Sequence, residues 1–335
     1  MKSSSAQSHY LDVLRGIAAL AVLISHADHA GLMALDLDIP QKVFLGRFGV
    51  DLFFILSGFL IWRSAQLISD ANSLMIYGVH RATRLLPLYL VNIAFVVLVL
   101  PHLVSTFEPH VSWDTLLRHL ALTQSLNPSV SRDLNPVLWT LTHEAIFYAV
   151  VPLLLMVPRL LLPVIGGIAF LVSWAPSTFA PFLAVFYLFT IGILLAEKRS
   201  YWALGAAVVF AAMQAMSPSH APVEIAAMVA AGALFFLAVA APARGLHVTL
   251  PLRWVGIVSY SLYIWHYLFI NLIGTENGLR AMSTATAGLS ENAVVRGALF
   301  VALVLAVSTV SYFAIERPGM GWLRKRLVLR YCSPD

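Results

Sequence analysis

Long runs of apolar residues, separated by short polar breaks, follow one another along nearly the whole chain. A transmembrane helix needs about 20 mostly apolar residues, with roughly 17 as the usual lower limit, and about ten runs come close to that length. The pattern therefore predicts an all-α, polytopic membrane protein with a single membrane-embedded domain over residues 1–335. The predicted helices cover residues 12–33, 48–68, 86–104, 138–157, 160–175, 180–196, 201–216, 223–241, 254–273 and 294–315.

Composition supports the membrane prediction and excludes a water-soluble fold. Of the 335 residues, 60% are hydrophobic and 11% are charged, whereas an average soluble domain carries about 25% charged residues. The polar breaks are too short to hold a separate soluble module. The net charge of +5 does not indicate nucleic-acid binding, because the basic residues are scattered through the breaks rather than gathered on one face.

The positions of Lys and Arg predict the orientation. With the N-terminus inside, fourteen of the 21 Lys and Arg residues lie in cytoplasmic breaks or at the termini and six lie outside, while Arg15 falls within the first predicted helix. Because cytoplasmic loops carry an excess of basic residues, this bias favours both termini in the cytoplasm.

The first apolar run, Ile17–Ile24, has the length of a signal-peptide core. However, Asp12 and Arg15 interrupt its flank, and no small-residue cleavage site precedes His26 and Asp28. We therefore interpret this run as part of the first helix of the mature protein.

The longest break, Ser105–Val137, is predicted to face outward and contains His110, Trp113 and His119. Loops of this length in compact proteins are often lids or binding elements. A loop without a functional role is an equally good interpretation of the sequence.

Arg15 and His26 are the first of several ionisable residues at bilayer depth, where such a residue costs at least about 2.5 to 3.5 kcal/mol and indicates a functional site. They are eleven residues apart, which on a helix is three turns plus about 20°, so they share a face and lie roughly 16 Å apart along the axis. We expect Arg15 near the cytoplasmic side and His26 near the outer side. The alternatives are an interfacial arginine paired with Asp12 and a helix-end histidine among the outer headgroups.

Other polar residues sort to the same two depths once the topology is fixed. On the outer side, we expect Asp51, Trp139, Glu144 and His266 to lie near His26 and to converge on one pocket.

On the cytoplasmic side, Arg15 is joined by Arg81 and Arg84 before the third predicted helix and by Glu316 after the tenth. Arg81 and Arg84 are three residues apart, so they share one face of a helical turn and could grip phosphate groups through charge-assisted hydrogen bonds. Ordinary cytoplasmic positive charge is the alternative for these two arginines.

Ser57 and Gly58 fall near the midplane, where small side chains would let a cofactor arm pass or would let two helices pack tightly. No metal site is predicted, because His26 and His29 lack a carboxylate ligand at a suitable spacing. The single cysteine, Cys332, excludes an intrachain disulfide.

These motifs together resemble the acyltransferase-3 family of integral membrane O-acyltransferases, which modify bacterial surface polysaccharides, nodulation factors and some antibiotics. The resemblance runs from Leu11 to Pro318, and the chain is similar to the stand-alone class without a C-terminal esterase-like domain. The motifs that carry it are LDVLRGIAAL followed by His26, GVDLFFILSGFLI, RATRLLPLY with Arg81 and Arg84, LWTLTHEAIFY with Trp139 and Glu144, SYSLYIWH with His266, and ERP at Glu316.

The resemblance implies an enzyme of the bacterial cytoplasmic (inner) membrane that uses a cytoplasmic acyl-CoA, expected to be acetyl-CoA, as donor substrate, with no permanently bound cofactor. The acceptor is expected to be a hydroxyl of an extracytoplasmic carbohydrate or glycolipid. A secondary transporter or flippase is the alternative, because buried His, Glu and Arg residues also mark transport pathways. A purely structural scaffold would leave the intramembrane charges unexplained.

Each candidate residue has a hypothetical role in that reaction. His26 acts as general base or forms an acyl-imidazole intermediate, and Glu144 or Asp51 orients it. The remaining roles are donor binding by Arg15, Arg81, Arg84 and Ser57, acceptor binding by Trp139 and His266, and a structural or gating role for Glu316.

Overall fold

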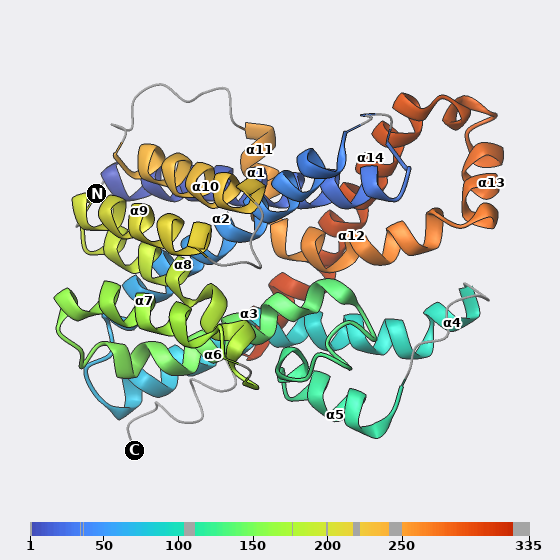
Figure 1. The fold of residues 1–335 in the computed structure, drawn as a ribbon. Coiled ribbons are helices and arrows are strands. Elements are labelled where there is room, and N and C mark those ends of the chain that lie inside the picture. Colours follow the sequence, from blue (N-terminus) through green and yellow to red (C-terminus); the bar gives the residue numbers. More distant parts are fainter. Residues whose placement is uncertain are drawn as a thin grey trace, which may run out of the picture. The chain divides into compact units, whose positions relative to one another are not determined.

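The computed structural model describes residues 2–33, 35, 37–103, 111–175, 177–198, 200–216, 222–240 and 250–323. Within these ranges the secondary structure is helical and no strand occurs, so the all-α prediction is confirmed (Figure 1). The α-helices are α1 (Lys2–His29), α2 (Ile39–Ala65), α3 (Ala71–Leu98), α4 (Leu100–Leu103), α5 (Trp113–Leu120), α6 (Trp139–Leu154), α7 (Leu162–Val172), α8 (Ala180–Ala196), α9 (Ser200–Met216), α10 (Pro222–Ala240), α11 (Leu250–Ile257), α12 (Ser259–Ile273), α13 (Glu276–Ala285) and α14 (Ala293–Ser311). Short 3-10 turns are η1 (Gln124–Leu126), η2 (Pro136–Leu138), η3 (Arg159–Leu161) and η5 (Leu289–Glu291), and η6 (Tyr312–Glu316) is a π-helical turn.

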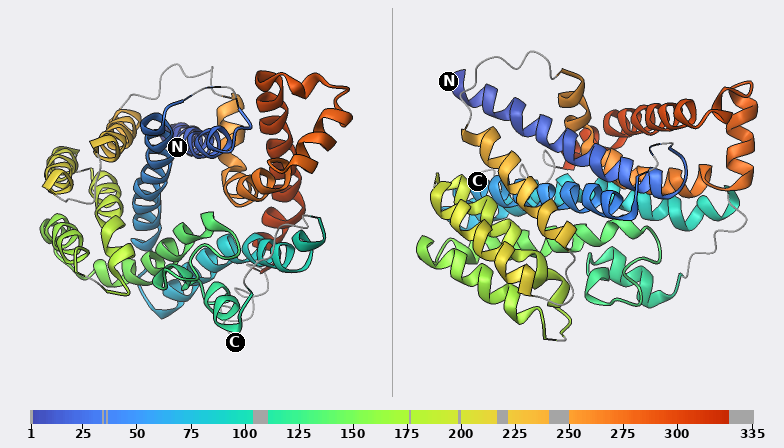
Figure 2. Two further views of the ribbon diagram at one scale, coloured as in Figure 1. Left: turned by 45° about the vertical axis from the view of Figure 1, so that its right-hand side comes forward. Right: turned by 45° about the horizontal axis from the view of Figure 1, so that its top comes forward.

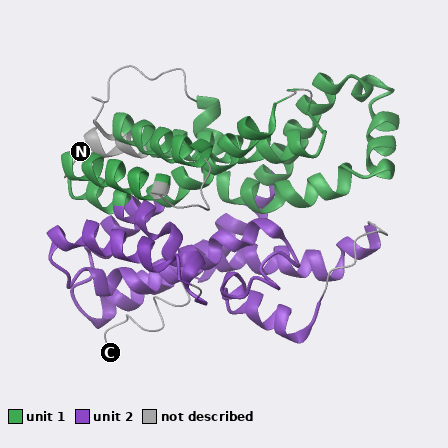
Figure 3. Ribbon diagram, viewed as in Figure 1, with its two compact units in different colours: residues 1–56, 191–309 green, residues 57–190, 310–335 purple. Residues whose placement is uncertain are grey.

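The chain forms two compact units, shown in green and purple in Figure 3. Unit 1 consists of Met1–Leu56 and Ile191–Thr309, and unit 2 consists of Ser57–Thr190 and Val310–Asp335. The chain passes from one unit to the other within α2, within α8 and near the end of α14.

Within the described residues, five helices are long and apolar enough to cross a membrane, and α11 with α12 would make a sixth if that bent pair is one span. The five are His9–His29, Ile39–Ala65, Ala71–Leu98, Pro136–Leu154 and Ala293–Leu323. Shorter apolar helices are Arg159–Val172, Ala180–Ala196, Tyr201–Met213 and Pro222–Ala238. The predicted segments thus fall on helices, whereas ten complete spans and the cytoplasmic termini stay predictions.

Unit 1 is built around the packing of α1 on α11 and α12, which lie beside it in both views of Figure 2. Two glycines allow the backbones to touch, since a Cβ atom on Gly16 would collide with the Leu252 carbonyl oxygen and one on Gly256 with the Asp12 carbonyl oxygen. Apolar side chains fill the space beyond these contacts. The buried cluster comprises Ala19, Leu23, Ala27, Leu32, Val255, Leu262, Ile270, Ile273, Phe300 and Val304.

The predicted helix 254–273 is in fact broken. α11 and α12 meet at Val258 and are bent by 76°. The apolar run continues through the break, so hydrophobicity alone did not reveal the bend.

The third helix begins much earlier than predicted, and the placement of Arg81 and Arg84 before it was wrong. α3 starts at Ala71, where the Asp70 side chain accepts a hydrogen bond from the backbone N–H of Ser73 and the Ser73 hydroxyl caps Asp70 in return. This reciprocal cap specifies a helix start ahead of the apolar run. Both arginines therefore lie inside a candidate membrane span.

Glu316 was predicted after the last helix, and this was also wrong. The helix continues from Ala293 to Leu323, with Glu316 in the π-helical turn η6. Such turns are rare and frequently mark functional positions, because the wider turn re-aims the side chains that follow it.

Candidate functional site

His26 on α1 and His266 on α12 face each other in unit 1. The Nδ1 atom of His26 lies 2.9 Å from the Nε2 atom of His266, which is a hydrogen-bond distance. His266 is fully buried and His26 is half-buried. The Tyr267 ring stands edge-on to His26, at 5.6 Å between centroids. The structure thus brings together two predicted site residues that are far apart in sequence.

Asp51, predicted to orient His26, is bound to Arg47 in the structure, and its role toward His26 stays a prediction. It is fully buried on α2, and its carboxylate oxygens lie 3.0 and 3.3 Å from Nε of Arg47 on the same helix. Among the described residues, the hydrogen bond that orients His26 comes from His266. The acceptor-binding role of His266 stays a prediction, and the structure adds its contact with the His26 ring.

Arg15 lies near the middle of α1, about three turns before His26 on the same face, beside two further charged groups. Its Nη1 is 3.7 Å from one carboxylate oxygen of Asp12, and Nε of Arg253 on α11 is 3.6 Å from the other oxygen. Both distances are longer than a hydrogen bond, so Asp12 attracts the two guanidinium groups by charge without a hydrogen bond at these atoms. The two printed ion pairs of this cluster thus share one carboxylate, that of Asp12.

Arg253 is a candidate that sequence reasoning missed. In the sequence it was counted only as one of the basic residues in the predicted cytoplasmic breaks. The available signal was its position just before Gly256 and the SYSLYIWH motif. Contact with α1 comes from the glycine-mediated backbone packing, which a single sequence does not reveal.

Arg81 lies in a polar cluster of unit 2, on α3. Its guanidinium donates a hydrogen bond to Ser64 and lies over the rings of Tyr77 and Tyr148, at 5.4 and 5.5 Å from their centroids. The Tyr148 hydroxyl in turn donates to the Glu144 carboxylate one helical turn away. Glu144 was predicted to lie beside His26, and within unit 2 it belongs to the surroundings of Arg81.

Arg81 has no carboxylate within ion-pairing distance in the described part of the chain. Its Nε is buried and makes no hydrogen bond there. A buried guanidinium is costly without an anionic partner. Among the described residues, Arg81 is thus held by a hydroxyl and two aromatic rings rather than by a carboxylate.

Arg84 differs from Arg81 because it has an ion-pair partner. Its Nη1 lies 2.9 Å from Oε1 of Glu316, which is 1% exposed, and 4.0 Å from the Met320 sulfur. This pair links α3 to η6 within unit 2. Nearby, a Cβ atom on Gly319 would come within 2.6 Å of the Pro87 side chain, so the two helices are also closely packed there.

Ser57 and Trp139, the remaining predicted residues, lie in unit 2. Ser57 is half-buried, and a Cβ atom on the adjacent Gly58 would collide with the backbone of Phe189 on α8. Tight helix packing is thus the observed use of that glycine. The Trp139 ring stands edge-on to the His143 ring at 5.2 Å.

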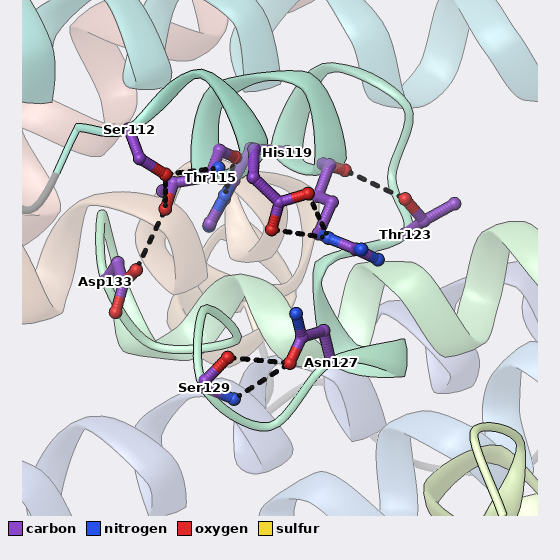
Figure 4. A network of polar contacts seen from close by, with 9 residues as sticks. Ser112, Thr115, His119, Thr123, Asn127, Ser129 and Asp133 are labelled. Atoms are coloured by element: carbon purple, nitrogen blue, oxygen red, sulfur yellow. Dashed lines mark hydrogen bonds and ion pairs between the residues drawn. The ribbon is translucent and has the colours of Figure 1, made fainter.

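The described part of the long predicted loop is an ordered polar network, drawn in Figure 4. Ser112 caps α5 by accepting from the Thr115 N–H at 3.0 Å, and Thr115 Oγ1 donates to Asp133 at 3.1 Å. The buried His119 ring donates from Nδ1 to the Thr115 carbonyl, and burial lowers its pKa below the usual value, although that carbonyl and Asp133 oppose the shift. Residues 104–110, including His110, lie outside the described residues, and a lid or binding role for this segment stays a prediction.

Comparison with known proteins gives one family. The chain matches the acyltransferase domain family Acyl_transf_3 over residues 8–313. It is 29% identical to the exopolysaccharide production protein ExoZ of Rhizobium meliloti, over 85% of this chain and 92% of ExoZ. It is 25% identical to the peptidoglycan O-acetyltransferase OatA of Listeria monocytogenes, over 96% of this chain but only 56% of OatA. Nodulation protein 10 of Rhizobium leguminosarum is 31% identical over 59% of this chain and 61% of that protein. No solved structure matches.

Proposed function

Because the chain belongs to the acyltransferase family that matches residues 8–313, we propose that it transfers an acetyl group from cytoplasmic acetyl-CoA to a hydroxyl of an extracytoplasmic carbohydrate. The names of ExoZ and OatA, an exopolysaccharide production protein and a peptidoglycan O-acetyltransferase, support a carbohydrate acceptor. A surface polysaccharide or its lipid-linked precursor fits this description. The protein would act in the bacterial cytoplasmic membrane with both termini inside.

The observation that carries the proposal is the distribution of chemistry along α1. The Arg15, Asp12 and Arg253 cluster lies near the middle of α1, and the pair of His26 and His266 lies close to its C-terminal end. The two groups share a face and lie roughly 16 Å apart along the axis. α11 and α12 run parallel to α1, because Asp12 meets Arg253 and His26 meets His266 in the same chain order. This direction agrees with the predicted topology.

Donor binding is assigned to the arginines. A guanidinium group binds phosphate through paired, charge-assisted hydrogen bonds. In unit 1, Arg15 and Arg253 bring two guanidinium groups close to the single carboxylate of Asp12. In unit 2, Arg81 has no carboxylate within ion-pairing distance among the described residues. Arg84, whose charge is matched by Glu316, contributes chiefly to the structure of α3.

The chemistry is assigned to His26. Its imidazole removes the proton from the acceptor hydroxyl as that oxygen attacks the thioester carbonyl, a role typically worth about 10²- to 10⁴-fold. The tetrahedral intermediate then expels the CoA thiolate, which takes up the proton held by His26. A route through an acyl-imidazole gives the same products, with His26 attacking first and the hydroxyl second.

The proposal is tested with purified protein, acetyl-CoA labelled in the acetyl group and an oligosaccharide acceptor. We expect base-labile label on the sugar and free CoA in equal amounts. His26→Ala should retain less than about a tenth of this turnover, whereas His29→Ala, which changes an exposed histidine on the same helix, should retain it. A transporter or flippase would leave the label on CoA, and that result would overturn the proposal.

A further inference from the structure

The position of His266 points beyond acceptor binding. It is 0% exposed, and both of its ring nitrogens have partners: Nδ1 lies 2.8 Å from the Tyr263 carbonyl oxygen and Nε2 lies 2.9 Å from Nδ1 of His26. A sugar therefore cannot reach this ring without breaking a buried hydrogen bond. The ring contacts the candidate base instead.

The two imidazole rings meet edge to edge in nearly one plane. Their planes are 10° apart and their centroids are separated by 5.2 Å, while the nearest nitrogens are 2.9 Å apart. For two five-membered rings, a centroid distance of 5.2 Å and a nitrogen distance of 2.9 Å occur together only when both nitrogens lie close to the line that joins the two centroids. The two nitrogens therefore point directly at each other. An N–H and a lone pair both lie in the ring plane, so this is the geometry of a well-aligned N–H···N hydrogen bond.

The direction of the hydrogen bonds follows from the Tyr263 carbonyl. A carbonyl oxygen only accepts, so Nδ1 of His266 carries its proton. In the neutral ring the Nε2 atom of His266 then presents a lone pair, and the hydrogen between the rings belongs to Nδ1 of His26. The remaining nitrogen of His26, Nε2, is left with the lone pair that a general base needs.

We infer that His266 is a positioning residue that fixes the tautomer and the ring plane of His26, so that Nε2 of His26 faces the reaction as base or nucleophile. This inference rests on the proposed acyl transfer. When Nε2 of His26 takes a proton, its Nδ1–H bond to His266 becomes charge-assisted and stronger. His266 supplies this acceptor without a permanent charge, which suits a site at bilayer depth where a carboxylate would be costly.

Two variants of His266 separate this role from a structural one. His266→Leu puts an apolar side chain in the buried position and removes the acceptor, whereas the amide oxygen of His266→Gln reaches about as far as Nε2 and still accepts. We expect His266→Leu to lower kcat by about tenfold or more while both KM values stay within about twofold. His266→Gln should recover a large part of that loss. In a His26→Ala background, His266→Leu should cause no further loss, because it acts through the absent ring. Equal losses in the Leu and Gln variants, or a further loss without His26, would overturn the inference.

Nuclear magnetic resonance of ¹⁵N-histidine-labelled protein in lipid bilayers tests the tautomer without any activity. The His26 signals are identified by their absence from the His26→Ala spectrum. We expect a protonated Nδ1 and an unprotonated Nε2 in the native protein and in His266→Gln, and a mixture of tautomers in His266→Leu. His102→Leu, which changes an exposed histidine on α4, should leave the His26 signals unchanged. A proton on Nε2 of His26 in the native protein would overturn the inference even if acyl transfer occurs. The expected tautomer without acyl transfer would instead refute the proposed function alone.

Discussion

Gly256→Ala is predicted to loosen the contact between α1 and α11. The added methyl group would collide with the Asp12 carbonyl oxygen, which belongs to a helix backbone and cannot swing aside like a side chain. Overpacking of this kind typically costs about 1 to 3 kcal/mol. The better helix propensity of alanine offsets at most about 1 kcal/mol. We therefore expect the free energy of unfolding to fall by about 1 to 2 kcal/mol.

The same change should weaken donor binding. Separating α11 from α1 moves Arg253 away from Asp12 and Arg15 and so opens the positive cluster. A hydrogen bond to a charged group is worth about 1.5 to 3 kcal/mol, and losing about half of one such contact corresponds to a three- to tenfold higher KM for acetyl-CoA. The kcat at saturating donor should change little, because the contact is made equally in the ground and transition states.

The matched control is Gly205→Ala on α9, also in unit 1. No heavy atom lies within 4 Å of the Cβ position there, so alanine should leave the free energy of unfolding unchanged or raise it by up to about 1 kcal/mol. Helicity is followed by circular dichroism during titration with a denaturing detergent, and KM is measured with the labelled donor. Equal stability of the two variants, with an unchanged KM in Gly256→Ala, would refute the packing argument.

Three further predictions concern the arginines and the topology. Arg81→Ala should raise the KM for acetyl-CoA several-fold in steady-state kinetics, because it removes a proposed anion-binding group. A lower kcat at unchanged KM would indicate instead that Arg81 acts in the transition state. Arg84→Ala should lower the free energy of unfolding by about 3 to 5 kcal/mol in detergent titration, since it leaves Glu316 buried without its ion pair, and wild-type stability would argue against a structural role. In a cysteine-free background, a cysteine at position Arg15 should react with an impermeant reagent from the cytoplasmic side and be protected by CoA, and one at position His26 should react from outside. Labelling of both from one side would contradict the topology.

The helices could be predicted from the sequence because apolar length is the property that a bilayer selects. The start of α3 at Ala71 was missed because its first turns carry polar residues, although the Asp70 and Ser73 cap was readable. The bend at Val258 was missed because it interrupts no apolar run. Neither the cap nor the bend alters the length of an apolar run, so a prediction made from such runs passes over both.

For the candidate site, the structure shows which of the predicted residues contact each other, and it confirms only some of the expected pairings. The predicted depth in the membrane was the same for His26 and His266, and these two residues form a hydrogen bond. Glu144 was predicted at the same depth, whereas its carboxylate accepts a hydrogen bond from Tyr148, one turn along α6. Depth says nothing about rotation around a helix axis, and for Glu144 the local i,i+4 contact decides the direction of the side chain.

The most direct test of acyl transfer across the membrane uses proteoliposomes in which the protein has one orientation. Labelled acetyl-CoA is supplied on the side of Arg15 and a carbohydrate acceptor is enclosed on the side of His26. We predict acetyl ester on the enclosed carbohydrate, no ester with His26→Ala, and no ester when donor and acceptor exchange sides. Ester formed only when donor and acceptor share one side, or labelled acetyl-CoA found intact in the lumen, would contradict transfer along α1.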